Sequence, residues 1–185
     1  IGGGKLDVID LLNRIGVNST TPIIVGGSTH NGEEEILART YINLKKQFPD
    51  LFLVLVPRHF ERTKNVMDVL ENLNIPFILR TEINKEKRYE PGSIQCLLVN
   101  TTGELKEFYK VATVVFVGKS LTAEGGQNPI EPAALGKPIV FGPNMQNFKA
   151  IVKILINRQA AIQVEDASKL ENVFANYDAR NQLYY

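Results

Sequence analysis

The sequence predicts an open, doubly wound α/β domain built on a parallel sheet of about six strands. Short apolar runs alternate with amphipathic segments along most of the 185 residues. The run Leu51–Val56, LFLVLV, is almost continuously apolar, as in a strand that is covered on both faces. Polar, glycine-containing segments directly follow several of these runs, as loops at the carboxyl edge of a parallel sheet do. Alternation of this kind is typical of doubly wound α/β proteins.

Each expected element rests on a local pattern. The short apolar runs that are candidates for strands are Pro22–Val25, Leu51–Val56, Pro76–Leu79, Ile94–Val99, Val114–Val117, Ile139–Phe141 and Ala161–Val164. Apolar residues at helical spacing predict helices over Val8–Ile15, from Glu33 to about Lys46, from Arg62 to Leu73, from Thr101 to Ala112, from Pro129 to Gly136, and over Phe148–Ile156 and Ala167–Tyr177. We therefore expect a linker and short helix over residues 1–20, the main domain over 21–177, and a tail over 178–185.

Composition excludes several classes of protein. Hydrophobic residues make up 44% and charged residues 22%, which is ordinary for a globular domain, and a net charge of +1 favours neither nucleic acid nor a membrane surface. The single cysteine, Cys96, rules out a disulfide framework and is expected to be a small buried hydrophobe. The chain starts IGGGKLD without an initiator methionine, so we expect it to be part of a longer protein.

Polar loops are expected to converge at one edge of the sheet, because the strand-to-helix connections of a parallel sheet all emerge there. They are Gly26–Glu33, Pro57–Arg62, Asn100–Glu104 and Gly118–Glu131. Each opens a helix, and helix N-termini present free N–H groups and a partial positive charge. The sequence therefore predicts a site for an anion that carries hydroxyl groups.

The first three loops contain candidate ligands with competing structural roles. Ser28 and His30 can donate to a phosphate or carboxylate, although Ser28 or Thr29 could equally cap the next helix. Arg58 follows a buried strand and is either a plain exposed side chain or a bidentate phosphate or base contact. In the third loop, the backbone of Thr102–Glu104 could face a ligand, and a simple capping turn is the alternative.

The fourth loop carries the most specific pattern. Gly118, Gly125 and Gly126 are expected to leave room for a ligand against the backbone. Asn128-Pro129-Ile130-Glu131 reads as a capping box with Asn128 as the N-cap residue. The functional alternative is that Glu131 accepts hydrogen bonds from a ribose diol, since a carboxylate offers two acceptor oxygens.

Patterns that are missing narrow the chemistry further. The sequence has no Walker-type phosphate loop, no G-x-G-x-x-G after the first strand, no Asp-x-Asp metal pair and no Cys/His cluster. A nucleotide-sugar site without a metal or other cofactor is therefore favoured over an NTPase, a dehydrogenase or a zinc enzyme.

Several runs, in order and in spacing, resemble the C-terminal half of the Kdo (3-deoxy-D-manno-octulosonic acid) transferases of lipopolysaccharide assembly. The resemblance extends over roughly Gly4–Val164. The matching runs are GKLD at Gly4–Asp7, GGSTHNGEEE at Gly26–Glu35, LVPRHFER at Leu55–Arg62, TTGELKEFY at Thr101–Tyr109, FVGKSL at Phe116–Leu121, GGQNPIEPAALGKPIVFGP at Gly125–Pro143 and QNF at Gln146–Phe148.

The resemblance implies a Rossmann-like domain that forms the C-terminal, donor-binding half of a GT-B glycosyltransferase. The donor would be CMP-Kdo, and the acceptor, a lipid A precursor, would bind the N-terminal domain that also holds the catalytic base and the inner-membrane anchor. No residue of this chain is then expected to be catalytic, and the chain alone is expected to be inactive. The positions matching the family's CMP-contacting segments are Pro57, Arg58, Thr102, Gly103, Glu104, Asn128, Pro129, Ile130 and Glu131. Those matching positions near the donor phosphate or Kdo carboxylate are Ser28, His30 and Ser120.

Two positions depart from the family's pattern. Lys119 stands where the family usually has the second glycine of Gly-Gly-Ser-Leu, and Gln127 where it usually has the histidine of Gly-Gly-His-Asn. Lys119 either adds a cation near the phosphate or points to solvent, and Gln127 keeps a hydrogen-bonding side chain that cannot become cationic.

Two other readings of the sequence remain open. One is a different GT-B member that binds a UDP-sugar, either a glycosyltransferase or a 2-epimerase. The other is a non-catalytic α/β ligand-binding or signalling module. A receiver-like module would need acidic residues at the strand ends, whereas the first strand here runs into Gly26-Gly27.

Overall fold

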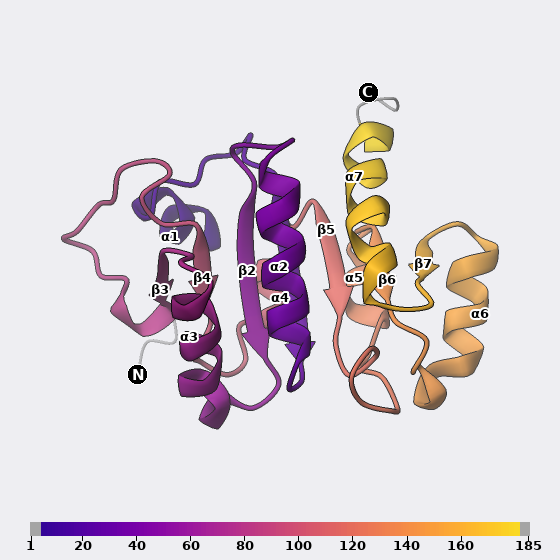
Figure 1. Ribbon diagram of the computed structural model, residues 1–185. Coiled ribbons are helices and arrows are strands. Elements are labelled where there is room, and N and C mark those ends of the chain that lie inside the picture. The colour runs from indigo at the N-terminus through magenta and orange to yellow at the C-terminus, as the bar shows by residue number, and fades with distance from the viewer. Residues whose placement is uncertain (1–4, 182–185) are drawn as a thin grey trace.

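The computed structural model describes residues 5–181, and its centre is a sheet of seven strands in the order β3-β4-β2-β1-β5-β6-β7 (Figure 1). All neighbouring strands pair in parallel. The strands are β1 (Ile23–Thr29), β2 (Phe52–Pro57), β3 (Phe77–Leu79), β4 (Cys96–Leu98), β5 (Val114–Val117), β6 (Ile139–Phe141) and β7 (Ala161–Gln163). The doubly wound α/β prediction is confirmed, with every candidate run forming a strand and a total of seven against the expected six or so.

Helices cover both faces of this sheet. They are α1 (Val8–Arg14), α2 (Glu33–Lys45), α3 (Thr63–Asn72), α4 (Leu105–Val111), α5 (Ile130–Ala134), α6 (Lys149–Asn157) and α7 (Leu170–Asn181). Buried residues of α2, α3 and α7 pack on one face, which is nearer the viewer in Figure 1, and those of α1, α4, α5 and α6 pack on the other. The predicted helix end at Tyr177 is too early, because α7 continues to Asn181, and the rest of the expected tail lies outside the described residues.

The core explains why the second strand is so apolar. All six residues of β2 are buried, with Leu53 and Leu55 in the cluster under α2 and α3, and Val54 and Val56 in the cluster on the opposite face. Each such side chain contributes roughly 1.5–3 kcal/mol through burial, so a strand between two helical layers needs apolar residues at every position. Cys96 is fully buried in β4, and burial raises the pKa of its thiol, as expected for a small core residue.

The strand order reverses at β1. Its neighbours are β2 on one side and β5 on the other, so the connections leave β1 and β5 in opposite directions along the sheet. Gly27 pairs with Val56 of β2 and with Val117 of β5. In open α/β sheets such a reversal leaves a crevice at the carboxyl ends of the strands, which is where ligands bind.

The expected end of β1 is wrong, since the strand passes through Gly26-Gly27 and reaches Thr29. A Cβ on Gly26 would lie 2.7 Å from a methyl of Leu37, and one on Gly27 would lie 2.0 Å from the Tyr109 hydroxyl oxygen. The two glycines therefore allow α2 and α4 to pack closely on opposite faces of the strand. The chain bends one residue later, at Ser28, where φ is +53° and the pairing with β2 shifts register.

The contact between Gly27 and Tyr109 predicts the cost of a side chain at this position. We expect Gly27→Ala to lower the free energy of unfolding by about 1–3 kcal/mol, because the methyl group meets the Tyr109 ring as well as its hydroxyl. Urea denaturation measures the change. Gly26→Ala is the matched control, since its nearest neighbour is the flexible end of Leu37, and it should cost less. A larger loss for Gly26→Ala would contradict this account.

No helix within residues 5–181 has the length and apolar character that crossing a bilayer requires.

Candidate functional site

The loops that follow β1, β2 and β5 meet at the carboxyl edge of the sheet. The amide of Gly118 donates to the Gly27 carbonyl over 2.9 Å, and the amide of Arg58 donates to the Thr29 carbonyl over 3.0 Å. The Thr122 hydroxyl donates to the carbonyl of Asn31 over 2.6 Å. The predicted convergence of these loops is therefore confirmed.

A buried carboxylate, Glu33, joins the loop after β1 to the loop after β5. The side chain has no exposed surface, and its oxygens accept four backbone N–H groups. One comes from His30 at 2.8 Å, and the others come from Lys119, Ser120 and Leu121 at 2.7, 3.1 and 3.0 Å. A carboxylate is expensive to bury without partners, and here every one of these bonds is assisted by its charge. From the sequence, Glu33 was expected only as the residue at which a helix begins.

Ser120, which was predicted to lie near the ligand's phosphate or carboxylate, is used within the protein, so its place near a ligand stays a prediction. Ser120 is fully buried, and its amide is used by Glu33. Its hydroxyl donates to the Val117 carbonyl over 2.6 Å and accepts from the Gly142 amide over 3.0 Å. Ser120 therefore ties β5 to β6, and the row of amides in this loop binds an anion supplied by the chain itself.

A second ion pair holds the loop after β2. Arg62 donates to both oxygens of Glu34, over 2.7 and 3.0 Å, and the Thr29 hydroxyl donates to the same carboxylate over 2.9 Å. The Glu34 side chain is 2% exposed, so the pair lies in a sheltered environment, where breaking it is costly. The Thr29 hydroxyl therefore helps to hold the Glu34–Arg62 ion pair, which fixes the loop after β2. The proposed capping of α2 by Ser28 or Thr29 is wrong, since the cap residue is Gly32.

Both histidines of the chain lie at this edge. His30 and His59 face each other edge to face, with ring centroids 6.0 Å apart. The Nδ1 atom of His30 is 3.2 Å from the Ser28 carbonyl, which favours a proton on Nδ1 and leaves Nε2 for a ligand. Ser28 and His30 are thus placed together, as predicted. His59 was not predicted as a site residue, although its place directly after Arg58 was a signal that it would share the edge.

Arg58 is an exposed cation beside these imidazoles. It follows Pro57, the buried last residue of β2, and its side chain forms no ion pair or hydrogen bond with any part of the chain that the structure describes. Neighbouring arginines differ, since Arg62 is held by Glu34 and Arg80 by Glu104. Arg58 therefore keeps all its donors available for an anion.

The loop after β4 is only partly as expected. The Glu104 carboxylate accepts from Arg80 over 2.9 and 3.3 Å and from the Thr101 hydroxyl over 3.0 Å, so it is already occupied. Thr102 and Gly103 are exposed, and a Cβ on Gly103 would meet no atom within 4 Å. Glu104 takes the N-cap position of α4, but no side-chain hydrogen bond caps the helix, so the expected capping does not form.

The capping box predicted at Asn128–Glu131 does not form. Helix α5 begins at Ile130, its N-cap residue is Pro129, and Asn128 Oδ1 accepts the Ile130 amide over 2.9 Å as a tight local turn. Glu131 is consequently one residue too early to reach back to the cap. It is exposed, and its carboxylate has no hydrogen bond to residues 5–181. Both its oxygens are free to accept from ligand hydroxyls.

The glycines of the fourth loop do not make room for a ligand, contrary to prediction. A Cβ on Gly118 would lie 2.2 Å from the Ser28 carbonyl oxygen, and one on Gly126 would lie 2.4 Å from the sulfur of Met145. A Cβ on Gly125 would likewise lie 2.8 Å from the side-chain amide nitrogen of Asn147. The space is filled by neighbouring loops of the protein, and the glycines are needed for that packing.

Lys119 occupies a backbone conformation that favours glycine. Its φ is +54°, and its amide is held by Glu33. The Cε atom lies 3.7 Å from the position of a Cβ on Gly125, so the ammonium group sits over the start of the Gly125–Glu131 segment. No acidic side chain within residues 5–176 forms an ion pair with it. Gln127 lies on the same segment, and its backbone N–H donates to the Gly118 carbonyl over 3.1 Å.

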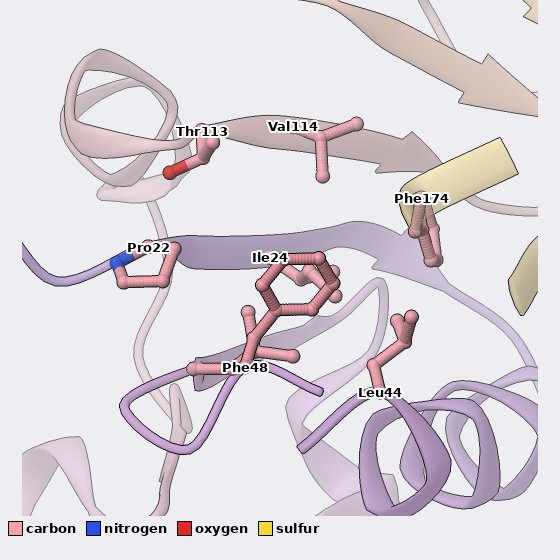
Figure 2. A pocket seen from close by; sticks show the side chains of 8 residues that line it. Pro22, Ile24, Leu44, Phe48, Thr113, Val114 and Phe174 are labelled. Atoms are coloured by element: carbon pink, nitrogen blue, oxygen red, sulfur yellow. The ribbon is translucent and has the colours of Figure 1, made fainter. Parts of the chain in front are cut away.

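An apolar cavity of about 20 Å³ lies at the opposite, amino edge of the sheet. Figure 2 shows the ring of Phe48 and that of Phe174 beside Ile24 and Leu44, with Thr113 at the start of β5. Its volume is near that of a single water, and its walls are almost wholly apolar, so it does not suit a nucleotide. Within the described part of the chain, no group of three or more His, Cys, Asp or Glu is placed to hold a metal.

These features define the class. A seven-stranded parallel sheet with a reversal at β1, and polar loops that gather cations and an unpaired carboxylate at the carboxyl edge, are those of a Rossmann-like, doubly wound α/β domain. Solved structures agree. A C-terminal domain of a group 1 glycosyltransferase, LpcC from Francisella tularensis, shares the fold with a TM-score of 0.58 over 98% of this chain, at 11% identity.

Two sequence relatives are more informative. The 3-deoxy-D-manno-octulosonic acid transferase of Haemophilus influenzae is 37% identical over 149 residues, which is 80% of this chain and 34% of that protein. That of Aquifex aeolicus is 31% identical over 155 residues, or 84% of this chain and 41% of that protein. The chain thus spans between a third and two fifths of the length of these relatives. No protein-family profile matches it.

The structural match identifies which part is shared. The C-terminal CMP-Kdo binding domain of WaaA from Acinetobacter baumannii superposes with a TM-score of 0.79 and 29% identity, over 95% of this chain and 86% of that domain. The chain is homologous to Kdo transferases over about a third of their length, and its fold corresponds to the C-terminal domain of one of them.

The buried carboxylate predicts a strong effect of a small change. We expect Glu33→Gln to lower the free energy of unfolding by about 2–3 kcal/mol, because an amide NH₂ replaces one acceptor oxygen in front of backbone donors. Hydrogen exchange should show faster exchange at the amides of Lys119, Ser120 and Leu121. Glu35→Gln is the control, since Glu35 pairs with Arg39 on an exposed surface and should cost little. Unchanged protection in Glu33→Gln would contradict the role given to Glu33.

The conformation of Lys119 predicts a substitution that stabilises the domain. We expect Lys119→Gly to raise the free energy of unfolding by about 0.5–1 kcal/mol, because glycine adopts a positive φ without strain. Denaturant titration measures this. The control is Lys153→Gly in the middle of α6, where glycine should cost about 1 kcal/mol. Destabilisation of both variants would show that Lys119 makes contacts that outweigh its strain.

Proposed function

We propose that this domain binds CMP-Kdo as the donor for transfer of Kdo to a lipid A precursor in lipopolysaccharide biosynthesis. The observation that carries the proposal is the match over 86% of a domain described as CMP-Kdo binding, at 29% identity. That level of identity, together with the 37% identity to a Kdo transferase, supports the same donor rather than the fold alone. The UDP-sugar enzymes considered from the sequence are not favoured.

The free groups at the carboxyl edge suit the parts of this donor. Arg58, His30 and Lys119 offer cationic or donor groups to a phosphate or to a sugar carboxylate, and none of them forms an ion pair within residues 5–181. The Glu131 carboxylate, free of intramolecular hydrogen bonds in the described chain, is matched to a ribose diol. Donor atoms and acceptor atoms thus lie on the same edge, as binding a sugar nucleotide demands.

The remainder of the reaction belongs to another domain in this proposal. This chain positions the donor, while a preceding domain binds the lipid A precursor, carries the general base and associates with the cytoplasmic face of the inner membrane. No residue of this chain takes a catalytic role, and the domain does not turn over substrate by itself.

We further propose that the transfer needs no metal. The cationic side chains at the carboxyl edge would balance the charge of the phosphate in place of a divalent ion, as a guanidinium does through two parallel hydrogen bonds. Donor binding in the presence of a chelator tests this point.

The proposal predicts selective binding of CMP. Isothermal titration of the chain with CMP and with UDP should give tighter binding of CMP, and Arg58→Ala and Glu131→Ala should each weaken it by about 10-fold, through loss of a charge-assisted hydrogen bond. Arg39→Ala is the matched control, because Arg39 is an exposed arginine of α2 paired with Glu35. Tighter binding of UDP than of CMP would refute the proposed donor.

A further inference from the structure

Tyr109 brings a hydroxyl group to the strand reversal from the underlying helix. Tyr109 is 2% exposed and belongs to the core cluster on the face of the sheet that α4 covers. The hydroxyl oxygen lies 2.0 Å from the place that a Cβ on Gly27 would occupy, so only a glycine leaves it room. Gly27 is also the residue that pairs with both β2 and β5. The hydroxyl therefore lies against β1 at the strand reversal, two residues before the strand ends at Thr29.

This hydroxyl has no partner in the described chain. No donor or acceptor within residues 5–176 forms a hydrogen bond with it, whereas Tyr41, another core tyrosine, donates to the Leu51 carbonyl over 3.1 Å. Every side-chain oxygen or nitrogen in this range that is cut off from solvent is hydrogen-bonded, so the Tyr109 oxygen is the part of the side chain that reaches the surface. Buried tyrosines ordinarily use their hydroxyl, and an unused one beside a crevice is available to a ligand.

The electrostatic surroundings keep this group a donor. Burial raises the pKa of Tyr109, and the nearby carboxylate of Glu131 raises it further, so the phenol is protonated at neutral pH. Glu131 lies on α5, which packs against α4, the helix that carries Tyr109. Two adjacent helices, α4 and α5, thus carry a donor and an acceptor that the described part of the protein does not use.

We propose that the Tyr109 hydroxyl is a further binding group of this site, donating a hydrogen bond to an acceptor oxygen of the nucleotide while Glu131 accepts from its hydroxyls. The inference rests on the proposed function and adds a residue to it. The acceptor is either a ribose oxygen or a phosphate oxygen, and the two are chemically alike in accepting one hydrogen bond. Gly27 is needed for this arrangement, because any side chain at that position would displace the Tyr109 hydroxyl.

The test is Tyr109→Phe, titrated with CMP and with cytidine and compared with the unchanged chain. We expect a melting temperature close to that of the unchanged chain, because the hydroxyl has no partner to lose, and CMP binding weaker by about 3- to 10-fold, the net worth of one hydrogen bond. If the acceptor is on the ribose, cytidine binding weakens by the same factor. If it is on the phosphate, CMP binding weakens and cytidine binding does not.

Tyr41→Phe is the matched control. It removes a buried hydroxyl that does have a partner, on the opposite face of the sheet, so it should lower the melting temperature and leave CMP binding unchanged. Unchanged CMP binding in Tyr109→Phe, or a fall in its melting temperature as large as that of Tyr41→Phe, would overturn the inference and leave the proposed function standing. Absence of CMP binding in the unchanged chain would overturn both.

Discussion

The carboxylate of Glu33 is the interaction on which the site depends. It is buried between the loops that follow β1 and β5, the two strands on either side of the reversal, and it accepts N–H groups from both. Helix N-termini and rows of amides in α/β proteins commonly bind an external anion. Here the Glu33 carboxylate takes the place of that external anion and binds the amides of the loop after β5. The loop is therefore preformed, and only the side chains that project from it can bind a ligand.

The charged groups at the carboxyl edge divide into two sets. Glu33, Glu34, Arg62, Glu104 and Arg80 are bound to one another or to the backbone, and they fix the shapes of the loops. Arg58, Lys119 and Glu131 have no such partner within residues 5–181, and they carry the charge that a ligand meets. Residues of the first set are costly to change because partners would be left buried and unpaired, whereas those of the second set affect binding more than stability. The Tyr109 hydroxyl belongs with the second set, although its ring is part of the core.

Sequence patterns predicted most of the fold but only part of the site. Strands such as Leu51–Val56 are evident because burial on both faces demands unbroken apolar character, and three loops were correctly expected to meet at one edge. The capping box at Asn128–Glu131 and the space above Gly118 were predicted wrongly, and the bonding of Ser120 within the protein was not foreseen. The capping box fails for a local reason, because Pro129 takes the N-cap position of α5. The space above Gly118 and the use of the Ser120 hydroxyl depend instead on partners distant in sequence, the Ser28 carbonyl and the Gly142 amide. Local propensity carries no information about such partners.

The sequence by itself determined the class of fold, the edge at which polar loops gather and the resemblance to Kdo transferases, because apolar periodicity and the order of short runs are properties of the chain alone. Only the tertiary structure decided which of the polar residues are free. Glu33 and Glu131 are both glutamates at the start of a helix, yet one is enclosed by four amides and the other is open to ligand. That difference arises from how the loops after β1 and β5 pack together, and packing between distant segments determines whether a charged group is used by the protein or left for its ligand.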